Sequence, residues 1–173
     1  MSIINVVNGD ITSTAYHQHI IIGMNTGFKD VRGIGARVLE KVELLQKLRL
    51  GSVVTFPWDE SGRELHMLIC HKLGVGGWAS ADRYVRYGLD YLAHKEEQSE
   101  RGYGIVRIGT GRVGLRDGAD FVSIHTAMAT SFLPMTLFSY DKSYDEEPVS
   151  AEVRPLRPAS VWHVDDGFTR IAA

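Results

Sequence analysis

The sequence predicts one α/β domain in which helices pack in layers against a sheet. Short β-branched segments alternate along the chain with longer segments of helical periodicity, which is typical of alternating strands and helices. The length of 173 residues is enough for one domain with a substantial core, because domains cluster at roughly 100 to 150 residues. A hydrophobic fraction of 44% and a charged fraction of 23% indicate an ordinary globular protein.

The first half of the chain predicts four strands and one amphipathic helix. Residues 3–7 and 19–25 are short β-branched segments that we expect to form the first two strands. Residues 52–56 and 65–71 predict two more strands, because the turn-forming segment "PWDESGR" separates them. A helix is expected over residues 34–48, where apolar side chains fall on one stripe: Val38, Leu39, Val42, Leu45 and Leu48.

The second half predicts two helices and two strands. Ser80 is a good helix start, and an apolar helical face continues from there to about residue 99. Residues 102–109 predict the next strand, which ends in glycine. A helix is expected within residues 118–132, although its periodicity is poor, and residues 135–140 predict the last strand of the set.

The composition changes after Asp141, where the segment "DKSYDEEPVS" is acidic and polar and prolines follow. We therefore expect a domain over residues 1–141 and a C-terminal extension over residues 142–173. Two alternatives remain open for the end of this extension. It is either disordered, or it docks on the domain as an edge element through Val161, Trp162 and Phe168.

Charge, cysteine and histidine content exclude several classes of protein. A net charge of -2 argues against strong binding to duplex DNA. The single cysteine, Cys70, excludes an internal disulfide, and no apolar segment approaches the roughly 20 residues that span a bilayer. We therefore expect a cytoplasmic monomer that does not bind membranes. His17 and His19 would share one face of a strand, but a third ligand is not evident, so we expect no metal and no cofactor.

The segment Gly109–Gly114, "GTGRVG", matches the dinucleotide-binding pattern G-x-G-x-x-G. A dehydrogenase motif would open a helix directly, yet four residues intervene here before any helix can start. It would also need further strands to complete the dinucleotide site, and the motif lies in the last strand-helix-strand unit that we expect. We therefore reject the dehydrogenase interpretation.

A second glycine-rich loop changes the interpretation of the first. The segment "NTGFKDVRGIGAR" runs from the second predicted strand into the first predicted helix. Two such loops can face each other at the carboxyl edge of a sheet, where backbone N–H groups and helix N-termini bind phosphates. The alternative is that each loop is only a connecting turn. Arg32 and Arg112, one in each loop, would either clamp phosphate oxygens or be solvated surface residues.

Four segments in this order resemble the macrodomains, which bind ADP-ribose and often remove it from modified targets. They are "VVNGDIT", "IIIGMNTG" with "GIGARV", "ICHK", and "VRIGTGRVGLRDGADF". The last three are most similar to the branch that includes terminal ADP-ribose glycohydrolases and antitoxins that remove ADP-ribose from DNA. The resemblance covers about residues 3–140 and implies a three-layer α/β/α fold with a mixed, mostly parallel sheet.

The resemblance implies a set of ligand-binding residues. Asp10 would accept a hydrogen bond from the adenine amino group, the Ile11 N–H would contact the base, and Asn25 would bind the distal ribose. Tyr140 would stack on adenine. The two sides of the diphosphate would be lined by Gly33, Ile34 and Gly35, and by Gly109, Thr110, Gly111, Arg112, Val113 and Gly114. The alternatives are a turn role for Asp10, a left-handed turn conformation for Asn25 and a half-buried strand end for Tyr140.

Lys72 is the catalytic candidate that the resemblance implies, acting on C1 of the distal ribose. Partial burial near other cations would favour its neutral, nucleophilic amine. The alternative is an ordinary surface lysine. Val113 stands where the eukaryotic glycohydrolases of this branch have an acidic residue, which weighs against a protein-glutamate hydrolase. Asp117 would substitute for that acid or cap a helix.

Two functions follow from these observations. The first is binding of ADP-ribose with hydrolysis of an ADP-ribose linkage on a modified protein or nucleic acid. The second is a non-catalytic module that reads or sequesters ADP-ribose or a related nucleotide derived from NAD. The expected partner in both is ADP-ribose or an ADP-ribosylated macromolecule.

Overall fold

The fold was analysed in a computed structural model of the chain. The structure describes residues 2–29, 31, 33–43, 48–74, 76–95, 100–108, 119–139, 155–165 and 168–172.

The described strands form one mixed sheet in the order β1-β6-β5-β2-β4-β3-β7-β8. The five strands from β1 to β4 in this order pair in parallel, whereas the pairs β4-β3, β3-β7 and β7-β8 are antiparallel. The strands are β1 (Ile3–Asn8), β2 (His19–Asn25), β3 (Ser52–Pro57), β4 (Glu64–His71), β5 (Tyr103–Val106), β6 (Met135–Ser139), β7 (Ser160–Asp165) and β8 (Phe168–Ala172).

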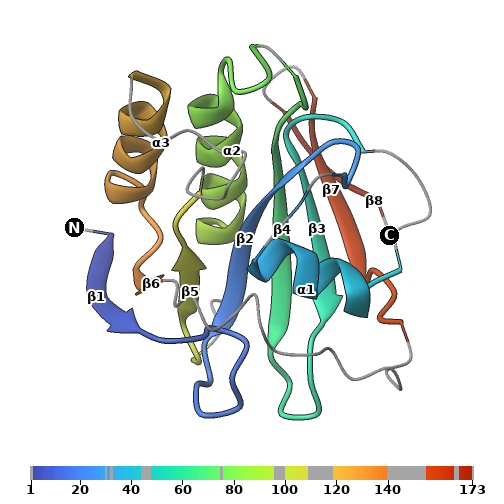
Figure 1. Ribbon diagram of the computed structural model, residues 1–173, viewed down its shortest axis with the longest axis vertical. Helices are drawn as coiled ribbons and strands as arrows, with labels where there is room; N and C mark the ends of the chain where they lie inside the picture. The colour runs from blue at the N-terminus through green and yellow to red at the C-terminus, as the bar shows by residue number, and fades with distance from the viewer. Residues whose placement is uncertain are drawn as a thin grey trace.

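Helices cover both faces of the sheet (Figure 1). One core lies between the sheet and α1 (Ile34–Lys41), whose Val38 is fully buried. A second core lies on the other face, beneath α2 (Ala81–Ala93) and α3 (Ala119–Ala129). The predicted three-layer α/β/α class with a mixed, mostly parallel sheet is confirmed. Within the described parts of the chain, the helices are too short or too polar to cross a membrane.

The first helix is shorter than its apolar stripe predicts. Helix α1 ends at Lys41, and Val42 is extended, with φ -114° and ψ 147°. Val42 forms an isolated parallel bridge with Leu156 of the C-terminal extension, where the Leu156 N–H donates to the Lys41 carbonyl at 2.7 Å. The expectation of a helix to residue 48 is wrong, because a distant segment captures the backbone groups that would continue it. Helix α2 likewise ends at Ala93 rather than near residue 99.

The last part of the extension belongs to the sheet. Strand β7 pairs antiparallel with β3, and β8 pairs with β7 to form the far edge of the sheet (Figure 1). Trp162 on β7 is 1% exposed and stacks on Tyr91 of α2, with ring centroids 4.4 Å apart. Strand β7 therefore contributes to the core through Trp162, which corresponds to the docked alternative for this segment.

Candidate functional site

Three of the predicted site residues lie where parallel strands end. Strand β1 ends at Asn8, β2 at Asn25 and β4 at His71, and Asn25 lies opposite His71 in the register of β2 and β4. Strand β1 belongs to the same parallel set through β6 and β5. Asp10, Asn25 and Lys72 therefore lie along one edge of the sheet, which we call the carboxyl edge. Edges of this kind bind ligands in open α/β sheets.

Asp10 shapes the loop that follows β1 and connects it to α1. Its Oδ1 accepts hydrogen bonds from the Thr12 N–H at 2.7 Å and from the Thr12 hydroxyl at 2.5 Å. Its Oδ2 lies 3.5 Å from Nη1 of Arg37 on α1. The Ile11 side chain is 1% exposed and packs into the core. These contacts correspond to the turn role of Asp10, and they hold the loop after β1 against the helix.

Arg63 fixes the same loop from inside the protein. Its side chain is 1% exposed, and it donates hydrogen bonds to the carbonyl of Ile11 at 3.1 Å and to that of Thr12 at 3.3 Å. Its Nε donates to Asp59 Oδ2 at 2.7 Å. Burial raises the pKa of Asp59, but hydrogen bonds from Ser61 and Arg63 outweigh burial and leave that pKa below its usual value.

Sequence reasoning missed Arg63 because it treated "PWDESGR" only as a turn. The spacing of Asp59 and Arg63, four residues apart, is a local signal for an ion pair. The partners at Ile11 and Thr12 have no such signal, because they lie about fifty positions away in the chain.

Asn25 organises the loop that follows β2. The residue is 2% exposed, and its Nδ2 donates to the Lys29 carbonyl at 2.8 Å. Its Oδ1 accepts from the N–H groups of Gly27 at 3.0 Å and Lys29 at 3.3 Å. Phe28, inside this loop, has a positive φ of 56°. Both ends of the Asn25 amide are engaged in loop contacts, and its contact with a ribose stays a prediction.

The N-terminus of α1 opens at the carboxyl edge with properties that suit an anion. Gly33 is the N-cap residue, with φ 63° and ψ -136°, a conformation that favours glycine. No described side chain caps this terminus, and its first turn contains no acidic residue. Backbone N–H groups and the helix dipole therefore direct positive charge outward from Ile34 and Gly35. Gly35 is buried, and a Cβ at this position would collide with Val31.

Lys72 lies directly after β4 at the start of a tight turn. Its side chain is exposed, so the partial burial that we expected is absent. Its N–H donates to the Gly77 carbonyl at 2.9 Å, and a Cβ at Gly77 would collide with the Lys72 carbonyl oxygen. The turn therefore requires glycine at position 77 and holds the Lys72 backbone beside the end of β2, where the Thr26 N–H donates to the His71 carbonyl at 3.1 Å.

The neighbours of Lys72 on β4 are held in neutral forms by burial. His71 stacks on Trp78 with ring centroids 3.7 Å apart, and burial lowers the pKa of His71 to about 4. Burial raises the pKa of Cys70 to about 12. A thiol with that pKa is a poor nucleophile at neutral pH. Burial therefore leaves a neutral thiol at Cys70 and a neutral imidazole at His71 beside the exposed Lys72.

Several predicted site residues lie outside the described residues. They are Gly109, Thr110, Gly111, Arg112, Val113, Gly114 and Tyr140, together with Arg32 and Asp117. In the sequence, Gly109 comes after β5 and Tyr140 comes after β6, and both strands belong to the parallel set. Their roles in binding stay predictions.

Two solved structures with a similar fold are macrodomains. The macrodomain of DarG from Thermus aquaticus aligns with a TM-score of 0.50 and 14% identity over 79% of this chain and 97% of that one. A macrodomain protein from Streptomyces coelicolor aligns with a TM-score of 0.56 and 15% identity over 79% and 99% of the two chains. The chain has a macrodomain fold.

A third structure and the sequence comparisons show that the similarity to macrodomains is limited to the fold. A protein of unknown function from Bacteroides thetaiotaomicron aligns with a TM-score of 0.57 and 16% identity over 78% of this chain and 96% of that one. No protein-family profile and no curated protein matches the sequence. The likeness to macrodomains is therefore one of fold, and the chemistry at the carboxyl edge must be argued from the residues of this chain.

Proposed function

We propose that the protein binds ADP-ribose at the carboxyl edge of the sheet. The observation that carries this proposal is the N-terminus of α1, which enters through Gly33 at positive φ and has no side-chain cap among the described residues. A helix terminus of this kind offers N–H groups and partial positive charge to a diphosphate. The contact between Arg37 and Asp10 places this terminus beside the loop after β1.

The loops on either side of α1 suit the two ends of such a ligand. Asp10 lies in the loop after β1 and carries the carboxylate that we assign to the adenine amino group. Asn25 ends β2 and Lys72 follows the neighbouring strand β4, and we assign the distal ribose to this pair. The diphosphate then lies between them at Ile34 and Gly35. The macrodomain fold supports the same class of ligand.

We further propose that Lys72 acts on C1 of the distal ribose, so that the protein hydrolyses an ADP-ribose linkage on a protein or nucleic acid. Its exposure leaves the amine accessible to a ligand, and the turn closed by Gly77 fixes its backbone at the carboxyl edge. The alternative is a module that binds ADP-ribose without turnover. The exposed position of Lys72 suits both, and only the reaction distinguishes them.

Titration calorimetry with ADP-ribose, ADP and NAD tests the binding proposal. We expect saturable binding of ADP-ribose with one site per chain, and weaker binding of ADP because it lacks the distal ribose. Asp10→Ala should lower the affinity for ADP-ribose and the affinity for ADP by the same factor, since both ligands carry adenine. Absence of ADP-ribose binding at millimolar concentration would exclude the proposed function.

Turnover of ADP-ribosylated protein and DNA tests the catalytic role. We expect Lys72→Ala to abolish the release of ADP-ribose while leaving the affinity for free ADP-ribose within about threefold, which is less than 1 kcal/mol. Lys29→Ala is the matched control, because Lys29 is an exposed lysine in the neighbouring loop. Turnover that persists in Lys72→Ala would exclude catalysis by Lys72, and binding without turnover of either substrate would support the non-catalytic module.

A further inference from the structure

Three side chains at the opposite edge of the sheet have the composition of a metal site. His19 begins β2, and Glu64 and His66 lie at the start of β4. We call this group the amino edge cluster. Each residue offers one ligand atom, and these atoms all lie within 4.8 Å of one another. The cluster lies at the other ends of β2 and β4 from Asn25 and His71, so it is separate from the proposed ADP-ribose site.

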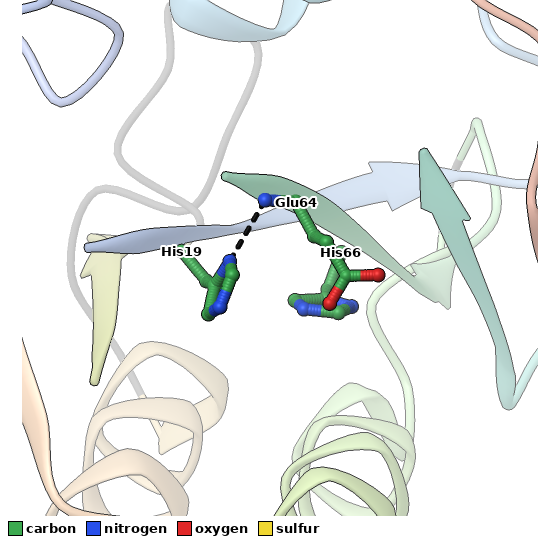
Figure 2. Close-up of side chains that lie close together, drawn as sticks. All are labelled: His19, Glu64 and His66. Atoms are coloured by element: carbon green, nitrogen blue, oxygen red, sulfur yellow. Dashed lines mark hydrogen bonds between the residues drawn. The ribbon is translucent and has the colours of Figure 1, made fainter. Parts of the chain in front are cut away.

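Strand pairing explains why residues so distant in sequence converge. Side chains alternate between the faces of a strand, so His19 shares a face with Ile21, and Glu64 shares one with His66. Ile21 lies opposite His66 in the parallel register and belongs to the core beneath α2 and α3. Figure 2 shows the three side chains projecting from β2 and β4 toward that helical layer. We expected no metal from the sequence because His17 and His19 lack a third ligand nearby in the chain.

His66 is the observation that points to a ligand. It is fully buried, and its Nε2 has no hydrogen-bond partner in the described part of the chain. Its Nδ1 lies 2.8 Å from the Thr55 hydroxyl oxygen. That hydroxyl can accept a hydrogen bond from Nδ1–H, which leaves the lone pair of Nε2 directed away from Thr55. This is the arrangement of a metal-binding histidine whose other nitrogen is held by an outer partner.

Glu64 supplies negative charge beside this imidazole. A carboxylate oxygen of Glu64 lies within 4.8 Å of a ring nitrogen of His66 and of one of His19. The Glu64 residue is only half-buried. Its carboxylate can therefore rotate without disturbing the core, and water can reach it.

His19 has a different role from His66. Its Nδ1 accepts the Glu64 backbone N–H at 2.7 Å, so the proton of the neutral imidazole is on Nε2 (Figure 2). An Nε2 that carries a proton donates a hydrogen bond and does not ligate a metal. The ring is 4% exposed and lies 5.6 Å from that of Tyr103. His19 is thus a fixed hydrogen-bond donor within the cluster.

We propose that Glu64 and His66 bind a divalent transition-metal ion, with waters in its remaining positions and His19 as a positioning residue that donates a hydrogen bond to one of those waters. Imidazole and carboxylate are ligands that suit zinc and its neighbours in the first transition row. Ligand atoms around a tetrahedral zinc are roughly 3.3 Å apart. The ligand atoms of Glu64 and His66 lie within 4.8 Å of each other, and the half-buried Glu64 side chain leaves room for its carboxylate to approach His66 further when an ion binds.

The test uses the full-length, tag-free chain after treatment with a chelator. Zinc chloride is titrated by calorimetry, and thermal unfolding is followed with and without zinc. We expect one ion per chain, a rise in Tm with zinc, and at least a thirtyfold loss of affinity in Glu64→Gln. His19→Gln should weaken binding about tenfold, in the range found for outer-shell partners. Glu60→Gln and His94→Gln are the matched controls, because both side chains are exposed and lie outside the cluster.

Glu64→Gln is the deciding variant, since His66 is fully buried and its replacement can prevent folding. Binding that is lost in Glu64→Gln and kept in both controls supports the proposal. No saturable binding up to 1 mM zinc, on the order of the weakest known protein-metal sites, would overturn it. Binding that Glu64→Gln leaves unchanged would also overturn it. ADP-ribose affinity measured on the same samples separates this result from the proposed function.

Discussion

The two edges of the same sheet use their polar residues in opposite ways. At the carboxyl edge, Asp10 and Asn25 form hydrogen bonds that shape their own loops, and backbone N–H groups of α1 and the exposed Lys72 lie at the same edge. At the amino edge, His66 keeps a buried Nε2 without a described partner. The carboxyl edge suits an extended anion, because its loops and the α1 terminus form an open surface. The amino edge suits a single ion, because side chains of two adjacent strands meet there.

We expect the largest effect from Arg63, because it links the two edges. It lies next to β4 at the amino edge and holds the loop that follows β1. Arg63→Met should lower the free energy of unfolding by about 3 kcal/mol, because it leaves Asp59 and two loop carbonyls without their buried partner. It should also weaken ADP-ribose binding. Urea unfolding measures the first effect. A loss below about 1 kcal/mol would show that the loop is held by other contacts.

His71 should make stability depend on pH at the carboxyl edge. Its folded-state pKa of about 4 lies below the ordinary value of 6.5, so the unfolded chain binds a proton first as the pH falls. Its contribution is complete above about pH 6.5 and is lost progressively between there and about pH 4, by up to about 3 kcal/mol. His71→Phe keeps a ring against Trp78 and should remove most of the pH dependence of the free energy of unfolding over this window, as measured by urea unfolding at a series of pH values. An unchanged slope would contradict the burial of His71, and exposed His94→Gln is the control.

Gly33→Glu should sharpen the assignment of the diphosphate to α1. A carboxylate there places negative charge where a phosphate should lie, and we expect about a hundredfold loss of ADP-ribose affinity, near 2.7 kcal/mol. Because Gly33 has φ 63°, any side chain there is strained, so Gly33→Ala is the matched control for strain. Calorimetry on both variants is the measurement. Equal losses in the two variants would attribute the effect to the backbone and not to charge.

The smallest expected effect is that of the amino edge on the ligand at the carboxyl edge. Glu64→Gln should leave ADP-ribose affinity within about twofold of wild type, which corresponds to less than 0.5 kcal/mol, because no described hydrogen bond joins the Glu64 side chain to Asp10, Asn25 or Lys72. The same calorimetric titration, with and without saturating zinc, checks this. A tenfold change would show that β2 and β4 couple the two edges.

Local patterns predicted most of the elements and part of the candidate site. The strand at residues 19–25 was predicted with the bounds of β2, because a β-branched segment that is buried on both faces has few alternatives. Gly33 was singled out because it lies in a glycine-rich segment that leads into a predicted helix, and the structure adds its positive φ. Helix α1 was predicted too long, since its end depends on Leu156, more than a hundred positions away.

By itself the sequence determined the alternation of strands and helices, the apolar faces that make three layers, and the placement of Asp10, Asn25 and Lys72 near the ends of strands. Only the tertiary structure decided which of these groups remain available to a ligand, that Arg63 supports the loop after β1, and that His19 meets Glu64 and His66. The physical reason is that propensity and periodicity act within a few residues. Hydrogen-bond partners and converging side chains depend instead on strand order and register.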